Sequence, residues 1–163
     1  MAPPPEESVS TIVVGVDGSK PSEAALESAI EMAKKTVSRL LIIYVCPLPA
    51  MPLVKGFPGY PHVMTSLPDL EPKVPQQIID KVSPILKEYE SRARKADIKD
   101  VEAKIIPVWG SVGSGLVKAA EKEKCAMIVV GSRGLTGIKR TLLGSVADYV
   151  VKNASCDVYV VRR

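Results

Sequence analysis

Residues 128–146 read IVVGSRGLTGIKRTLLGSV. The apolar run that opens this stretch is typical of a buried strand, and it stops at Gly131. A basic loop follows, and Gly144 and Ser145 begin a helical pattern that reaches about Asn153. Glycines let backbone N–H groups approach an anion closely, and the first turn of a helix adds unpaired donors and the positive end of its dipole. The stretch therefore predicts a strand, a loop and a helix start that can bind a phosphate group.

Apolar runs and helical patterns alternate along the rest of the chain. The first run, residues 11–16, is continuous and largely β-branched, as expected of a strand that is buried on both faces of a parallel sheet. The alternation predicts an α/β fold: a doubly wound, five-stranded, mostly parallel sheet with helices on both faces. The expected strands span residues 11–16, 39–46, 101–108, 125–130 and 157–161, and the expected helices span residues 21–35, 76–96, 116–123 and 144–153.

Two prolines and a glycine-rich segment qualify this pattern. Pro84 lies inside the second expected helix, where we expect a kink or a break. Pro107 lies in the third expected strand, which also alternates more than the others, and both features predict a peripheral strand. Residues 110–115 predict a turn into the third helix.

The length of 163 residues suits one domain with a sizeable core and is too short for two. We expect that domain to span residues 10–163, after a polar, proline-rich and disordered tail at residues 1–9. Residues 47–75 hold eight of the fourteen prolines, a density that excludes regular helix and central strand. We expect a long loop there, either functional or disordered, and composition does not decide between the two.

The composition argues against several classes of function. The 22 Lys and Arg residues against 18 Asp and Glu residues give a net charge of only +4, and the chain has a single Phe and a single Trp. Nucleic-acid-binding modules usually carry a stronger basic stripe or aromatic platforms, so we expect no nucleic-acid partner. The first residues have neither a basic nor an apolar leader region, and no run approaches the roughly 18 apolar residues of a membrane span. We expect a cytoplasmic protein with no membrane partner.

The three cysteines, Cys46, Cys125 and Cys156, are far apart in the sequence and none belongs to a C-x-x-C pair. Each lies at the edge of an expected strand. Small, buried hydrophobic side chains are the favoured interpretation, ahead of a redox role or a metal site.

The glycines of the opening stretch also have a specific spacing. Gly131, two residues, Gly134, nine residues and then Gly144-Ser145 resembles the G-x2-G-x9-G-[S/T] nucleotide signature of the universal stress protein family. The resemblance extends over about residues 11–162. It implies a Rossmann-like fold of the adenine nucleotide alpha hydrolase type, with ATP or AMP as ligand and Mg²⁺ as an optional counter-ion of the nucleotide. It also implies an intracellular stress sensor or regulator.

The resemblance assigns nucleotide contacts to ten residues, which lie near the ends of the first, second and fourth expected strands and at the start of the last expected helix. These are Val16, Asp17, Val45, Val130, Gly131, Arg133, Gly134, Gly144, Ser145 and Val146.

Several of these residues also have a plain structural interpretation. Asp17 can accept two hydrogen bonds from a ribose diol, the role that the family gives it, or it can be an ordinary turn or helix-capping aspartate. Without the resemblance, Val45 is an ordinary core valine. The family uses backbone groups at this position to recognise adenine. The side chain of Arg133 can face either the phosphates or the solvent, and the sequence favours neither interpretation. For Lys139 and Arg140, exposure to solvent is the favoured interpretation.

Two competing phosphate motifs fail on their spacing. Residues 110–115 are glycine-rich, but Lys118 falls three residues past the last glycine, so no Walker-type P-loop exists. Residues 113–118 lack the third glycine of a dinucleotide fingerprint.

Few side chains in the sequence suit a catalytic role. His62 is the only histidine and lies in the proline-rich segment, and no expected strand end offers a set of serine, base and acid. We therefore expect no catalytic residues and no metal site, and we favour binding over turnover, with weak ATP hydrolysis at most. The alternatives are an ATP-hydrolysing or nucleotidyl-transfer enzyme on the same scaffold, with chemistry supplied by residues 47–75, or a cyclic-AMP binder.

The last expected strand, Asp157 to Val161, predicts a homodimer. It closes the chain, so an edge position is expected, and an apolar edge strand is a template for a second chain. The family resemblance implies the same contact. The alternative is an edge covered by Arg162, Arg163 and the N-terminal tail. The family commonly has Cys-Pro before this strand, whereas this chain has Cys156-Asp157. No protein partner other than a second copy is indicated.

Overall fold

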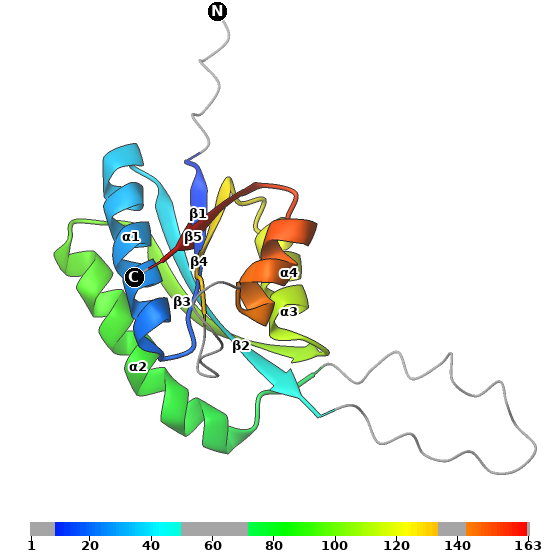
Figure 1. The fold of residues 1–163 in the computed structure, drawn as a ribbon. Coiled ribbons are helices and arrows are strands. Elements are labelled where there is room, and N and C mark those ends of the chain that lie inside the picture. The colour runs from blue at the N-terminus through cyan, green and yellow to red at the C-terminus, as the bar shows by residue number, and fades with distance from the viewer. Residues whose placement is uncertain (1–8, 50–71, 134–142, 163) are drawn as a thin grey trace, which may run out of the picture.

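The five apolar runs form a single parallel sheet in the computed structural model, which describes residues 9–49, 72–133 and 143–162 (Figure 1). The order of the strands across the sheet is β3-β2-β1-β4-β5. All four pairs of neighbouring strands are parallel. The strands are β1 (Thr11–Gly15), β2 (Arg39–Leu48), β3 (Val101–Trp109), β4 (Met127–Gly131) and β5 (Asp157–Val161).

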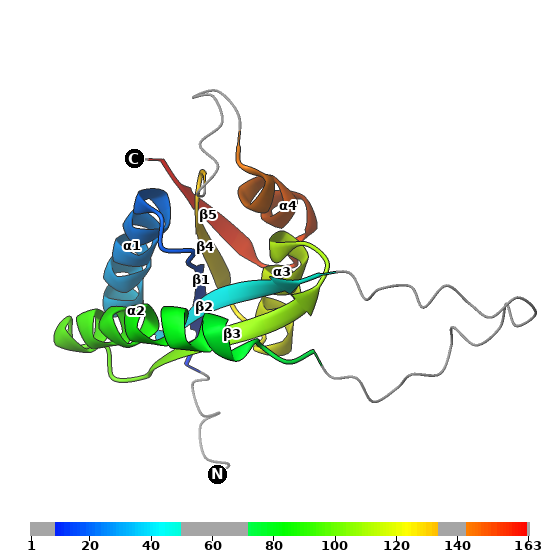
Figure 2. The same cartoon turned by 90° about the horizontal axis from the view of Figure 1, so that it is seen from below.

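Two helices cover each face of the sheet, as Figures 1 and 2 show from two directions. One face carries α1 (Lys20–Thr36) and α2 (Gln76–Lys95). The other face carries α3 (Val112–Lys122) and α4 (Ser145–Asn153). The prediction of a doubly wound α/β sheet is confirmed.

The alternation of side chains along each strand explains why both faces are covered. In β1, Val14 packs into the core beneath α1 and α2, whereas Val13 packs into the core beneath α3 and α4, and both are fully buried. In β2, Ile42 and Ile43 divide between the two cores in the same way. Successive side chains of a strand point to opposite faces, and both faces are covered by helices. A central strand must therefore be apolar at every position, which is the continuous apolar pattern of the sequence.

The path of the chain reverses direction next to β1. From β1 the chain adds β2 and then β3 on one side, and it then returns to place β4 and β5 on the other side. The topological switch point therefore lies between β1 and β4. In open α/β sheets of this kind, ligands bind beyond the carboxyl ends of the strands at the switch point.

The proline-rich segment begins two residues later than the sequence predicts. Pro47 and Leu48, expected in the loop of residues 47–75, belong to β2 and pair with Val108 and Trp109 of β3. The ladder with β1 ends at Ile43, so the last part of β2 has one neighbouring strand and tolerates a residue without an N–H group. Residues 72–75 have no regular structure, and residues 50–71 lie outside the described part of the chain.

Two helices also differ from the expectations. Of the kink or break predicted at Pro84, the break is wrong, because α2 continues through this residue, which lies on the exposed side of the helix. Water can solvate the carbonyl group that loses its partner there. The predicted turn at residues 110–115 is also largely wrong: α3 begins at Val112, because the side chain of Ser111 accepts a hydrogen bond from the N–H of Ser114 and caps the helix.

The predicted peripheral position of the strand with Pro107 is confirmed, since β3 is an edge of the sheet. The predicted tail at residues 1–9 lies outside the described residues except for Val9, which is exposed and has no regular structure. Among the helices of the described residues, none combines the length and the apolar character that crossing a membrane requires.

Candidate functional site

Four segments meet at the carboxyl ends of β1 and β4. Asp17 follows β1, Pro21 lies in the first turn of α1, Gly131 ends β4, and Gly144 precedes α4. A methyl group built on Gly131 would lie 2.7 Å from the carbonyl oxygen of Pro21, which shows how closely the start of α1 packs against the end of β4. The candidate residues from distant parts of the sequence therefore share one end of the sheet.

Ser132 fixes the start of α4 beside the end of β4. Its N–H donates to the carbonyl oxygen of Val161 at 2.8 Å, and its own carbonyl oxygen accepts from the N–H of Gly144 at 2.7 Å. Ser132 is also buried. These main-chain hydrogen bonds hold Gly144 next to the end of β4 and therefore next to the switch point.

The N-terminus of α4 has no side-chain cap. Gly144 is the N-cap residue, and it has no side chain that can accept a hydrogen bond from the first turn. The N–H groups of Ser145 and Val146 in that turn have no partner within the helix, as at every helix start. An anion placed there gains these donors and the positive end of the helix dipole.

Asp17 uses one carboxylate oxygen for its own turn. Its Oδ1 accepts a hydrogen bond from the N–H of Ser19 at 2.9 Å. No described residue donates a hydrogen bond to Oδ2. The N–H of Asp17 donates to Oγ of Ser22 at 3.2 Å, which ties the turn to α1. The two interpretations of Asp17 from the sequence are therefore compatible, because the turn uses only one oxygen.

Val16 and Val45 mark the point where β1 and β2 separate. The N–H of Val16 donates to the carbonyl oxygen of Ile43 at 2.9 Å, the last contact of this ladder. Main-chain groups of alternate residues point the same way along a strand, so those of Val45 point past the end of β1. The side chain of Val45 is buried and faces α3, where a methyl group built on Gly115 would lie 2.7 Å from Val45 Cγ1. Val45 thus presents only its main chain to the switch point.

The remaining candidates differ in how far the structure describes them. Val130 is a buried residue of the core beneath α3 and α4. Arg133 is half-buried, and no carboxylate of the described residues lies within ion-pair distance of it. Gly134 lies outside the described residues, as do Lys139, Arg140 and His62.

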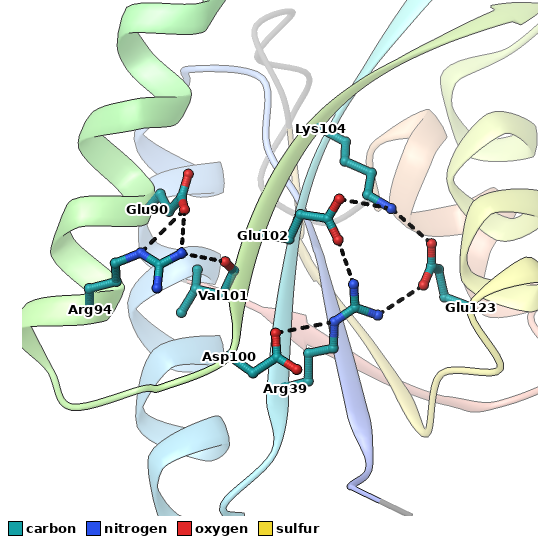
Figure 3. Close-up of polar contacts among 8 residues, drawn as sticks. All are labelled: Arg39, Glu90, Arg94, Asp100, Val101, Glu102, Lys104 and Glu123. Atoms are coloured by element: carbon teal, nitrogen blue, oxygen red, sulfur yellow. Dashed lines mark hydrogen bonds and ion pairs between the residues drawn. The ribbon is translucent and has the colours of Figure 1, made fainter.

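A network of ion pairs occupies the opposite, amino-terminal end of the sheet (Figure 3). Arg39, the first residue of β2, pairs with Asp100, Glu102 and Glu123. Lys104 of β3 pairs with the same two glutamates, at 3.2 Å from Glu102 and 3.0 Å from Glu123. Hydrogen bonds from Lys104 and Arg39 hold the pKa of Glu123 below its usual range. The charged groups of this network satisfy one another, which suits a structural role.

The described residues do not bring together three or more His, Cys, Asp or Glu side chains that could hold a metal ion. A hollow of about 430 Å³ lies on the exposed side of α2 among charged side chains such as Lys87 and Glu90. Its lining comes from one helix alone, so we assign it no binding role.

Comparison with known proteins identifies the family of this chain. The model of the universal stress protein family matches residues 9–162. The chain belongs to this family. It is 33% identical over 154 residues to a universal stress protein of Methanocaldococcus jannaschii, covering 93% of this chain and 81% of that protein. It is 32% identical over 158 residues to the universal stress protein YxiE of Bacillus subtilis, covering 93% of this chain and 97% of the relative.

A crystal structure of a universal stress protein in complex with cAMP has a similar fold, with a TM-score of 0.65 and 28% sequence identity. The match covers 94% of this chain and 97% of the other. Sequence reasoning missed Ser132, whose main chain joins β4, β5 and α4. A serine after a strand carries no distinctive signal, because its role comes from main-chain hydrogen bonds that any residue except proline can make.

Proposed function

We propose that this universal stress protein binds an adenine nucleotide, ATP or AMP, at the carboxyl ends of β1, β2 and β4. One observation carries the proposal: the hydrogen bond from Gly144 to Ser132 places the uncapped start of α4 at the switch point, beside the turn that holds Asp17. Unpaired donors and a carboxylate oxygen without a described partner then face the place where sheets of this type bind ligands.

Each part of the nucleotide has a matching group in this arrangement. The N–H groups of Ser145 and Val146, together with the loop from Gly131 through Gly134, would hold the phosphates, and Mg²⁺ would accompany a triphosphate. Oδ2 of Asp17 would accept a hydrogen bond from the ribose. The main chain of Val45 would contact the adenine. The related universal stress protein with bound cAMP supports an adenine nucleotide as the class of ligand.

Calorimetric titration with ATP and with AMP tests the proposal through Asp17→Ala. Losing a hydrogen bond to a charged acceptor costs about 1.5–3 kcal/mol, so we expect the affinity to fall roughly 10- to 150-fold. Asp80→Ala is a matched control, because Asp80 is an exposed helical aspartate that accepts a hydrogen bond only from Gln76 among the described residues. Wild-type affinity in a folded Asp17→Ala protein would contradict the ribose role.

We infer a sensor or regulator that responds to nucleotide binding, with at most weak turnover. The rival is an enzyme that hydrolyses ATP or transfers a nucleotidyl group with residues from the proline-rich segment. A phosphate-release assay separates the two, since typical enzymes turn over roughly 1 to 1,000 times per second. Mass spectrometry of the nucleotide released from purified, denatured protein identifies ATP, AMP or cyclic AMP as the resident ligand.

We also propose that two copies pair through β5. The strand is an edge of the sheet, and its exposed Tyr159 is an uncharged side chain on that edge. The N–H of Asp157 and the carbonyl oxygen of Val161 both bond toward β4 and its extension. By alternation, the main-chain groups of Val158 and Val160 point outward, where the strand of a second copy can accept and donate.

A further inference from the structure

Two cysteines that are separated by 31 residues in sequence meet in the fold. The Sγ atoms of Cys125 and Cys156 lie 3.2 Å apart. Cys125 precedes β4 and Cys156 precedes β5, and the register pairs Met127 with Asp157. The two thiols therefore lie at the amino-terminal end of the sheet, away from the candidate nucleotide site. The interpretation of three separate buried thiols did not anticipate this contact, because it depends on the register of β4 and β5.

Main-chain hydrogen bonds hold both thiols in place. The N–H of Cys125 donates to the carbonyl oxygen of Ala120 at 3.1 Å, at the end of α3. Ala126, the next residue, donates its N–H to Thr11 at 2.9 Å and accepts from the N–H of Asp157 at 3.3 Å. The approach of the two sulfurs is thus a consequence of the sheet and not of flexible loops.

A pocket of about 240 Å³ gives small molecules a route to the pair. Its lining includes both cysteines together with Glu121, Lys124 and Ser155. Cys156 is half-buried, whereas Cys125 is 9% exposed. Cys156 is therefore the thiol that a small oxidant reaches first.

The set of available ligands favours a covalent bond over a bound metal ion. A structural zinc ion takes four protein ligands. The described residues supply no third His, Cys, Asp or Glu beside the two thiols. A disulfide needs only the two sulfurs, which must approach from 3.2 Å to about 2.05 Å.

We propose that Cys125 and Cys156 are a reversible oxidation site that closes to a disulfide when the protein meets a peroxide. The Cys156 thiol loses its proton and its sulfur attacks a peroxide oxygen; the O–O bond breaks, the departing hydroxide takes up that proton, and a sulfenic acid and one water form. The sulfur of Cys125 then attacks the sulfur of Cys156, and the oxygen leaves with the Cys125 proton as a second water. Two thiols are oxidised and one hydrogen peroxide is reduced.

The order of these steps follows from the environments of the two thiols. Burial, and next the hydrogen bond with Cys156, raise the pKa of the Cys125 thiol. A thiol reacts as its thiolate, so Cys125 is a poor first nucleophile. It is well placed as the second sulfur, because Cys156 is already in contact with it.

The bond would fasten the edge strand to the sheet. β5 has β4 as its one neighbour among the described strands, and the cross-link joins the residues that lead into these two strands. The closed loop would contain β4, Gly131 and α4, and such a loop restricts the unfolded chain. Oxidation should therefore slow the opening of β5 and raise the thermal stability of the protein.

The test uses the full chain with Cys46→Ala, so that only the pair remains. Cys46 is buried in β2 and is a separate free cysteine. The protein is treated with stoichiometric hydrogen peroxide, the free thiols are alkylated, and the peptides are identified by mass spectrometry with and without reduction. We expect loss of both thiols, one intramolecular Cys125–Cys156 cross-linked peptide, and recovery of both thiols with dithiothreitol.

Thermal unfolding and hydrogen exchange give an independent readout. We expect the oxidised protein to unfold on the order of 10 °C higher than the reduced one, with slower exchange of the β5 amides. Cys125→Ala and Cys156→Ala should show neither effect after the same treatment. Three chemical outcomes would each overturn the proposal: sulfinic acid at Cys156 with a free Cys125, a cross-link between two chains, or unchanged thiols. These outcomes can be measured in the wild type even where a variant folds poorly.

Discussion

Gly131 has two separate reasons to be a glycine. It belongs to the loop that would approach a phosphate, and it also faces Pro21 at the start of α1, where a methyl group would lie 2.7 Å from the carbonyl oxygen and 2.8 Å from the carbonyl carbon. These are backbone atoms of a helix start, so they move only if the helix moves. The packing requirement therefore holds whether or not a ligand is bound.

Gly131→Ala should destabilise the protein in the absence of any nucleotide. Overpacking of this kind costs about 1–3 kcal/mol, and we expect that loss in the free energy of unfolding measured with urea. Gly18→Ala is the control: nothing lies within 4 Å of a methyl group there, and the cost comes only from the φ of +81°. Equal stability of Gly131→Ala and wild type would show that α1 adjusts freely and that the glycine serves the ligand alone.

Asp17 shows how one residue can meet a structural and a binding requirement together. The hydrogen bond to Ser19 fixes the direction of the carboxylate, so that Oδ2 is held in place before a ligand arrives. A preorganised group loses less conformational entropy on binding. The sequence suggested the two roles as alternatives, whereas the structure shows that the turn uses only Oδ1, so the proposed ribose contact would use the other oxygen.

At the scale of elements, α4 is the part of the site that can be tested most directly. Gly144 has φ −63° and ψ 158°, an extended conformation that is compatible with a following proline. Ser145 is the first helical residue, a position where proline is tolerated. Ser145→Pro therefore removes one N–H donor from the proposed phosphate site without breaking the helix.

We expect Ser145→Pro to weaken ATP and AMP binding by roughly 10- to 150-fold, since a hydrogen bond to a charged group is worth about 1.5–3 kcal/mol. Ser145→Ala, which keeps the N–H and removes only the hydroxyl group, should lose less. Adenosine has no phosphate, so both variants should bind it as the wild type does. Calorimetry with ATP, AMP and adenosine measures these affinities. An equal loss of affinity for adenosine would contradict the placement of the phosphates at the start of α4.

The ion network at the amino-terminal end of the sheet joins β2, β3 and α3 (Figure 3). The pKa of Glu123 is lowered from 4.5, mainly by the hydrogen bond from Lys104 and next by that from Arg39. Because the folded pKa lies below the unfolded one, the stabilisation is complete above about pH 4.5 and is lost as the pH falls through the folded pKa.

Glu123→Gln should therefore cost about 1 kcal/mol of unfolding free energy at neutral pH, the upper range for a partly exposed ion pair. The difference from wild type should shrink as the pH falls below about 4.5, because the wild type then loses the same charge. Glu88→Gln removes a more exposed partner of Arg92 on α2 and should have a smaller effect. A difference that grows on acidification would contradict the assigned direction. Urea unfolding at a series of pH values measures all three proteins.

The sequence predicted the elements well where one local pattern decides them. Apolar runs predicted the five strands, and Gly144-Ser145 indicated the start of α4. The sequence failed where a distant segment decides: Pro47 is a strand residue because β3 pairs with it. The start of α3 at Val112 is a different case, because Ser111 is a local capping signal and the glycines beside it favoured a turn instead. The contact of Cys125 with Cys156 depends on strand register, which no local pattern encodes.

At the scale of the whole molecule, the two ends of the sheet have different chemistry. The carboxyl ends of β1 and β4 carry Asp17 and the start of α4, where unsatisfied donors and acceptors gather. The amino-terminal end carries mutually paired charges and the Cys125–Cys156 pair. A change at the amino-terminal end can therefore alter stability while leaving the ligand groups in place.

The edge formed by β5 gives the last prediction, which concerns assembly. Tyr159 is 44% exposed on this strand, whereas Val158 and Val160 pack partly against the core, so Tyr159 is the residue that can be changed without disturbing the fold. A lysine on an edge strand opposes pairing with another strand, since a two-fold axis brings like charges from both copies near each other. We expect Tyr159→Lys to weaken a dimer at least about tenfold, or about 1.4 kcal/mol, in sedimentation velocity experiments.

Val151→Lys is the matched control, because Val151 is 49% exposed on α4 and not on the edge, and it should leave the dimer intact. A wild type that sediments as a monomer at high micromolar concentration would rule out pairing through β5, and a Tyr159→Lys dimer as strong as wild type would place the contact on another surface.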